Sequence, residues 1–138
     1  MGEFSWDKVP VKTGATADPA AQTNPAAITV TKRWLLKRLY ISYVSDANVA
    51  NRYCSLSITD GTNEIFAGNI IPPQTASLTC THNFGQTPYV NATLVTNNWA
   101  YMPELELEAG SVITLTFSNK AAADNAGPLR YFYHEATI

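Results

Sequence analysis

The carboxylates of Glu104, Glu106 and Glu108 are the first candidates for chemistry in this 138-residue sequence. Their spacing of two puts all three on one face of a β-strand, because successive side chains of a strand point to opposite faces. Paired carboxylates perform acid–base catalysis only in a cleft that separates their pKa values. On an exposed strand they more often maintain solubility or block pairing at a sheet edge, and a weak calcium site is the alternative.

His82 and His134 are the only histidines, and neither has the neighbouring ligands of a zinc site. His82 shares its alternating phase with Phe84, which indicates a hydrogen-bonded histidine in the core or at an edge. The sequence has no GxSxG motif for a nucleophile and no glycine-rich loop for a phosphate. We therefore predict a protein that is not an enzyme, with no catalytic residues, no metal and no cofactor.

Aromatic side chains are more numerous than a small core requires. Residues 97–101 (NNWAY) combine amides and rings in a loop-like setting, which makes Trp99 and Tyr101 candidate surface contacts. Exposed rings stack on sugars in carbohydrate-binding modules, and Tyr and Trp are also enriched at protein interfaces. Because the aromatics fall in both phases of the predicted strands, the sequence favours protein contacts over a glycan platform.

The elements that must position these residues are strands, predicted from alternating apolar and polar side chains. Residues 33–66 read as a long strand, a loop at 46–51, a second strand, a turn at Asp60-Gly61 and a third strand that ends near Ile71. Further strands are predicted at residues 28–31, 75–84, 89–96, 104–108, 112–118 and 129–138, with a break at 97–98 and a loop at 119–128.

Eight or nine short strands without a convincing helix predict an all-β fold, an antiparallel two-sheet β-sandwich of jelly-roll-like type. An immunoglobulin-like sandwich is the alternative. The shared phase predicts a core of Leu39, Ile41, Leu56, Ile58, Leu78, Ile113, Leu115 and Phe117. Cys54 and Cys80 have the same inward phase, so we expect buried free thiols, with a disulfide as the alternative.

Composition restricts the partners. Charged residues make up 14% of the chain, against about 25% in typical domains, and the net charge is −2. The sequence has no extended basic run, which argues against nucleic-acid binding. It also has no run of about 18 apolar residues, and its first residues do not resemble a signal peptide, so we expect no membrane segment.

Residues 1–27 differ from the rest, because they contain three prolines and no sustained periodicity. We predict an extended N-terminal arm there and a β-sandwich domain at residues 28–138. Phe4, Trp6 and Val9 are candidate anchors of this arm. They either fold back onto their own domain or contact a neighbouring subunit or partner.

Several motifs lie at strand ends and turns of residues 28–138: Lys32-Arg33-Trp34, Ala50-Asn51-Arg52, Asp60-Gly61, the segment QTASLT at 74–79, and Glu108-Ala109-Gly110. In this respect the sequence resembles a group of small proteins encoded by tailed bacteriophages. The resemblance implies a β-sandwich component of the virion, such as a capsid decoration (cement) protein. It implies no particular binding residues.

Together these observations lead us to expect a structural protein on the capsid exterior of a tailed phage, assembled in the host cytoplasm. Its expected partner is the major capsid protein, and we expect a homo-oligomer, with a trimer favoured. A glycan-binding module on a virion appendage and a head–tail junction protein are the alternatives.

Overall fold

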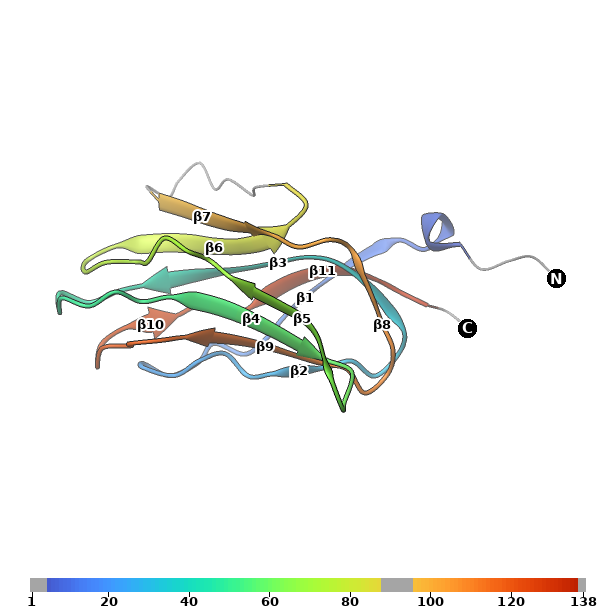
Figure 1. The fold of residues 1–138 in the computed structure, drawn as a ribbon, viewed down its shortest axis with the longest axis horizontal. Coiled ribbons are helices and arrows are strands. Elements are labelled where there is room, and N and C mark those ends of the chain that lie inside the picture. The colour runs from blue at the N-terminus through green and yellow to red at the C-terminus, as the bar shows by residue number, and fades with distance from the viewer. Residues whose placement is uncertain (1–4, 88–95, 137–138) are drawn as a thin grey trace.

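The computed structural model describes residues 5–87 and 96–136, and these residues form two packed β-sheets (Figure 1). The larger sheet has the order β1-β11-β3-β6-β7, and two short strands, β8 and β10, also pair with β3. Its strands are β1 (Val11–Ala15), β3 (Trp34–Val44), β6 (Thr79–Gly85), β7 (Thr96–Tyr101), β8 (Leu105–Leu107), β10 (Asn125–Ala126) and β11 (Arg130–Glu135). The predicted all-β sandwich is confirmed.

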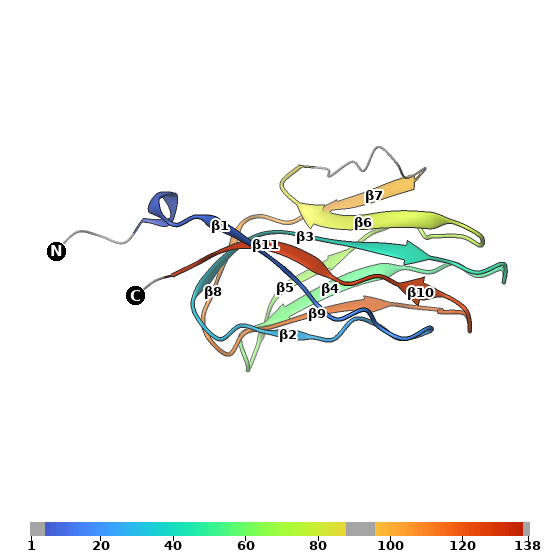
Figure 2. The ribbon, with the colours of Figure 1, turned by 180° about the vertical axis from the view of Figure 1, so that it is seen from behind.

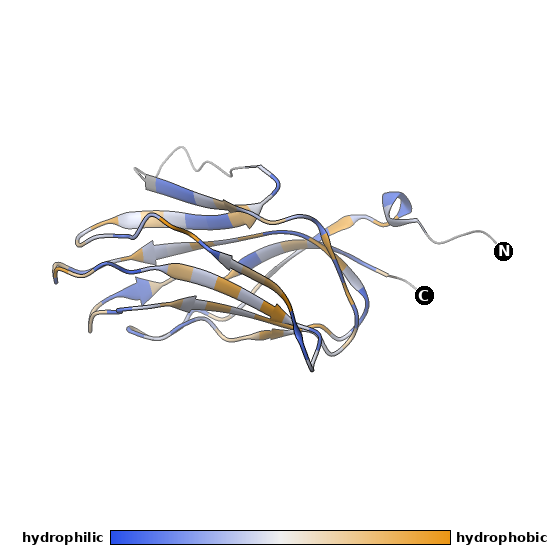
Figure 3. Cartoon of the chain, viewed as in Figure 1, coloured by the Kyte–Doolittle hydropathy of each residue, from blue (hydrophilic) through white to orange (hydrophobic). Residues whose placement is uncertain are grey.

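The smaller sheet has the order β2-β9-β4-β5, and its strands are β2 (Ile28–Thr29), β4 (Cys54–Thr59), β5 (Glu64–Asn69) and β9 (Val112–Phe117). Alternation is regular in β4, where inward residues are buried and the Ser and Thr residues between them are partly exposed. Figure 3 shows the same alternation as bands of hydropathy along β4. One short 3-10 turn, η1 (Trp6–Lys8), precedes β1.

The core lies between the sheets. Seven of the eight predicted core residues are 0–2% exposed, and Leu78 is only partly buried. The prediction fails at Leu78 because β6 begins at Thr79, whereas residues 76–77 form a turn in which Ser77 has a φ of +59°. Tyr43 from β3 stacks on Phe117 from β9 at 4.0 Å between ring centroids, which joins the two sheets.

Three further features differ from the predicted strands. β6 and β7 pair in parallel, although the sandwich was expected to be antiparallel throughout. β7 includes Asn97 and Asn98, where a break was predicted, while residues 89–95 of the predicted strand lie outside the described residues. Residues 11–15 of the predicted arm form β1, which pairs with β11 of the same chain.

A bulge in β3 shapes the larger sheet. Leu36 pairs with Tyr133 and Arg38 with Phe132, so β3 has one extra residue, Lys37, between the two pairs. Such a bulge breaks the strict alternation of side chains and re-aims the residues beside it. It places Lys37 and Arg38 side by side around the same hollow on the sheet surface.

Candidate functional site

The face of the larger sheet that points away from the smaller sheet, here called the outer face, holds two of the candidate binding residues, Trp99 and Tyr101. Strand register pairs Trp99 with Asn83, and Asn83 with Tyr40. Tyr40 pairs in turn with Arg130 of β11, which pairs with Ala15 of β1. Paired residues of neighbouring strands share a face, so these five residues form one row across five strands.

A second row runs parallel to the first. Tyr101 pairs with Gly85, and a Cβ atom on Gly85 would lie 3.2–3.4 Å from the guanidinium of Arg38. Arg38 pairs with Phe132, which pairs with Thr13. The missing side chain of Gly85 therefore lets the Arg38 guanidinium lie flat over β6, between Tyr101 and Phe132.

The rings on this face divide into a packed pair and two exposed residues. Tyr40 and Phe132 are stacked, with centroids 5.9 Å apart and an interplanar angle of 21°. Trp99 and Tyr101 are 39% and 58% exposed, and the indole N–H of Trp99 donates to the Gly85 carbonyl at 3.0 Å. The interpretation of the aromatics as scattered is therefore wrong for these four, which the fold gathers on one face.

Two hollows flank the Tyr40–Phe132 pair. The Arg38 hollow is lined by Val11, Lys37, Arg38, Gln86, Thr87, Glu104 and Phe132. The Arg130 hollow is lined by Thr13, Gly14, Ala15, Tyr40, Arg130, Tyr131 and Phe132. Phe132 contributes to both, so the stacked pair forms a ridge between two cationic depressions.

The electrostatics of these hollows favour anions. Lys37 pairs with Glu104 at 3.3 Å, and Arg38 donates to the carbonyl and to the hydroxyl of Thr87. The two hollows together contain three cationic side chains and one carboxylate, although the whole chain has a net charge of −2. The lining of the two hollows therefore carries a net positive charge, opposite in sign to the net charge of the chain.

The described anchors of the N-terminal segment contact their own domain. The indole of Trp6 donates to Glu106 at 2.8 Å, and Arg33 lies 5.4 Å from the centre of the Trp6 ring. Val9 is 8% exposed, and its carbonyl accepts a hydrogen bond from Nδ1 of His134 at 2.7 Å. Phe4 lies outside the described residues.

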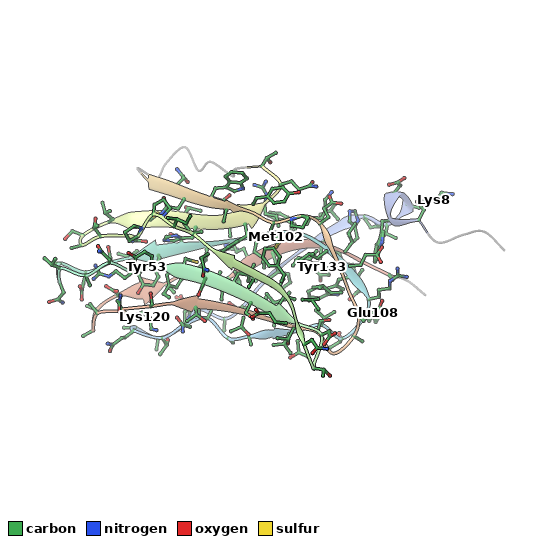
Figure 4. All side chains as sticks on the ribbon, viewed as in Figure 1. Lys8, Tyr53, Met102, Glu108, Lys120 and Tyr133 are labelled. Carbon is green, nitrogen blue, oxygen red and sulfur yellow. The ribbon has the colours of Figure 1, made fainter. Side chains whose placement is uncertain are left out.

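The three predicted strand carboxylates serve ion pairs. Glu106 and Glu108 contact Arg33 at 3.0 and 3.5 Å, and Glu104 contacts Lys37. Hydrogen bonds from Trp6 and Arg33 lower the pKa of Glu106. Within residues 5–87 and 96–136 no cluster of three or more His, Cys, Asp or Glu residues could hold a metal ion. Figure 4 shows Glu108 and Tyr133 at the same end of the sandwich as Lys8 of η1.

A buried ion-pair network ties two loops, residues 45–53 and 118–124, to each other and, through Tyr43, to β3. Arg52 is fully buried, and its Nε and Nη2 atoms donate to Asp124 at 2.8 and 3.0 Å. Nη2 also donates to Asp46 at 3.1 Å, and Nη1 donates to the carbonyl of Ala50 at 3.0 Å. The contacts give Arg52 a structural role, because all of them are to groups of its own domain.

Asp124 is the centre of this network. Burial by itself raises the pKa of the Asp124 carboxyl. Hydrogen bonds from Arg52, from two backbone N–H groups and from the Tyr43 hydroxyl lower this pKa by more than burial raises it, to about 2. The same environment, burial first and then the hydrogen bond to Asp124, raises the pKa of Tyr43 well above 10. Asp124 and Arg52 are therefore both charged at neutral pH, and their ion pair holds the loops in place.

A second buried polar pair links Gln74, which precedes β6 in the chain, to His82 of β6. Gln74 donates its amide N–H groups to the carbonyls of Tyr43 and Leu78, which leaves its oxygen to accept from Nε2 of His82 at 2.7 Å. Nδ1 of His82 then has no hydrogen-bond partner among the described residues, and burial lowers the pKa of this histidine to about 4.

Cys54 and Cys80 are both buried and free, as the sequence predicts. Burial raises the pKa of each thiol, to about 11 for Cys80. Because the thiolate is the reactive form, neither sulfur is suited to nucleophilic chemistry.

Comparison of the chain with protein-family models, with curated proteins and with solved structures gives no match. Among the described residues, no helix is long and apolar enough to cross a membrane.

Proposed function

We propose that this protein is a non-enzymatic structural component of a tailed-phage virion and binds the capsid exterior as a decoration protein. The observation that carries this proposal is the outer face, on which Trp99, Tyr101, Tyr40 and Phe132 lie in two rows with Arg38 and Arg130. Tyr, Trp and Arg are the residues most enriched among those that dominate binding energy at protein interfaces. The resemblance of residues 28–138 to phage proteins supports the choice of partner.

The size of the face bears on the oligomeric state. Five strands spaced about 4.8 Å apart and about 20 Å long cover roughly 400–500 Å². A specific interface buries about 800 Å² from each partner. One outer face therefore supplies about half of a stable interface, so we propose that a homotrimer presents three such faces to the lattice, where linked sites bind more tightly than single ones.

We propose that the capsid contact is made by the outer face of the larger sheet and not by the N-terminal arm. Trp6 and Val9 are occupied by Glu106, Arg33 and His134 of their own domain. Their proposed role is to hold β1 against β11, which completes the rim of the Arg130 hollow with Thr13, Gly14 and Ala15.

The test is cosedimentation of purified protein with phage heads assembled without it. The variant Trp99→Ala/Tyr101→Ala should lose at least tenfold in affinity, since truncating a central aromatic costs about 2 kcal/mol or more. Tyr53→Ala is the matched control, because Tyr53 is also 42% exposed but lies next to β4 of the smaller sheet. Equal binding by the double variant and the control would show that the outer face is not the contact.

The location of the protein in the virion distinguishes a decoration protein from a head–tail junction protein. Cryo-EM of the virion should show the protein over the capsid lattice. Density confined to the head–tail junction would instead support a junction protein, and absence of the protein from the particle would overturn the proposal.

A glycan-binding module on a virion appendage is the second candidate, and the shared face of the four rings favours it. Planar rings on one sheet face are the arrangement on which sugars stack. Titration with oligosaccharides should then change the tryptophan fluorescence of the wild type but not that of Trp99→Ala, and a glycan array would identify the sugar.

A further inference from the structure

The two arginines of the outer face occupy a diagonal position. Arg38 pairs with Phe132 and Arg130 pairs with Tyr40, so each arginine lies on the opposite side of the Tyr40–Phe132 ridge. Arg130 lies one strand across from Tyr40, and Tyr40 is two residues along β3 from Arg38. Two residues along a strand span about 6.7 Å and neighbouring strands lie about 4.8 Å apart, so the Cα atoms of the two arginines are about 8 Å apart.

The two guanidinium groups differ in how they are held. Arg38 lies over Gly85 and donates to Thr87, so its orientation is set by the fold. Arg130 is exposed and has no carboxylate within ion-pair distance among the described residues, in contrast to Arg33, Lys37 and Arg52. A ligand anion at Arg130 therefore has no internal carboxylate to displace.

Arginine is suited to oxyanion ligands, because its planar fork matches a carboxylate or a phosphate with two parallel hydrogen bonds. Of these two groups, the carboxylate is the one that the side chains of an unmodified protein partner offer. In an extended peptide, side chains at positions i and i+2 lie on one side, about 7 Å apart. That spacing is close to the separation of the Cα atoms of Arg38 and Arg130. The Arg38 guanidinium is displaced toward Gly85 of β6, so the two carboxylates must diverge from the segment to reach both guanidinium groups.

We propose that the outer face binds an extended acidic segment of the capsid partner, with carboxylates at positions i and i+2 seated in the Arg38 hollow and the Arg130 hollow. The segment crosses the Tyr40–Phe132 ridge between them. The excess of positive charge in the lining of the two hollows complements the acidic ligand. This inference rests on the proposed function and names the chemistry of its partner.

The experiment compares Arg130→Gln and Arg38→Gln with Lys32→Gln in binding to heads that lack the protein. Lys32 is exposed and lies outside both hollows, so Lys32→Gln removes the same charge without touching the site. Each arginine variant should bind about tenfold to 100-fold more weakly, as expected for loss of a charge-assisted hydrogen bond. Arg130→Lys should recover only part of the affinity, because lysine lacks the fork.

Two further measurements complete the test. Raising the salt concentration from about 0.05 to 0.5 M should weaken wild-type binding much more than binding by the double arginine variant. Thermal melting verifies that Arg38→Gln is folded, and the exposed Arg130 provides a variant for which folding is not at issue.

The outcomes separate the two proposals. Failure of the wild type to bind heads would overturn the proposed function together with this inference. Binding of the wild type that is unchanged in both arginine variants would overturn only the inference. Titration with alginate, a polyuronate, addresses the other source of carboxylates: arginine-dependent binding of alginate without arginine-dependent binding of heads would assign the site to an acidic glycan and overturn the inference.

Discussion

Replacement of Asp124 by Asn should be among the most damaging conservative substitutions in this protein. The carboxylate accepts hydrogen bonds from Nε and Nη2 of Arg52, from the hydroxyl of Tyr43 and from the backbone N–H groups of Asp46 and Ala121, at 2.8–3.0 Å. Asparagine keeps the shape but replaces one acceptor oxygen by a donor, which then faces other donors. It also leaves Arg52, which is 0% exposed, with Asp46 as its one carboxylate partner.

The magnitude follows from the burial of the arginine. Removing one partner of a buried ion pair costs about 3–5 kcal/mol, which is a large part of the 5–15 kcal/mol that stabilises a typical domain. Arg52→Met should cost less, about 2–3 kcal/mol, because Asp124 keeps the donors of Tyr43, Asp46 and Ala121. In the double variant the two losses should not add, with a coupling energy of about 1–3 kcal/mol.

Urea unfolding followed by tryptophan fluorescence measures these free energies. The midpoint should shift while the slope of free energy against urea concentration stays constant. A loss below about 1 kcal/mol for Asp124→Asn, or additivity in the double variant, would refute a stabilising role for the pair.

The pH dependence gives an independent check on Asp124. Its carboxyl has a pKa of about 2 in the folded protein, below its ordinary value of 3.8. The folded state therefore binds this proton less readily, so the contribution is complete above pH 3.8 and is lost as the pH falls toward 2. Asp124→Asn should lack this part of the acid sensitivity.

Three further predictions concern other parts of the molecule. His82 has a pKa of about 4 rather than 6.5, so wild-type stability should fall by up to about 3 kcal/mol as the pH drops from 6.5 to 4, and a flatter pH profile of unfolding is expected for His82→Gln. Gly14→Ala places a Cβ against the ring of Tyr131, which should cost about 1–3 kcal/mol in a urea titration; an unchanged midpoint would contradict the packing. Deletion of residues 1–15 removes β1 and should lower the melting temperature, whereas an unchanged melt would show that β11 is stable as an edge strand.

Alternation predicted the smaller sheet well because each face of its strands has one environment. In β4 and β9, Leu56 and Leu115 lie in the core, while Ser57 and Thr116 point outward. A period of two in the sequence then maps directly onto burial. The same rule predicted Leu78 in the core incorrectly. Apolar and polar residues still alternate through the turn at Ser77, and this pattern carries no information about the positive φ of that residue.

The larger sheet was harder to predict because long-range pairing decides its strands. Asn97 and Asn98 have low strand propensity, yet they lie in β7 through a parallel pairing with β6. No local signal in the sequence specifies a parallel partner.

The candidate site could be predicted only in part. Trp99 and Tyr101 were identified from residue type, but their neighbours Arg38, Tyr40 and Phe132 come from strands far apart in the chain. A shift of register by one residue would send each of these side chains to the opposite face. Alternation predicted Leu39 and Ile41 of β3 correctly, but the bulge at Lys37 shifts the phase, so the buried Leu36 does not follow from the same alternation.

The pairing of β1 with β11 also determines how the protein responds to pulling. Val11, at the start of β1, pairs with His134, near the end of β11, so both chain ends leave the sandwich at the same end (Figures 1 and 2). Hydrogen bonds of an antiparallel pair run perpendicular to the strands. Tension applied between the two ends therefore opens these bonds one after another, like a zipper, whereas tension on one end against the far loops loads them together in shear. Pulling on both termini should therefore separate β1 from β11 at low force. Pulling on one terminus against the far loops should leave the β1–β11 pairing intact at that force.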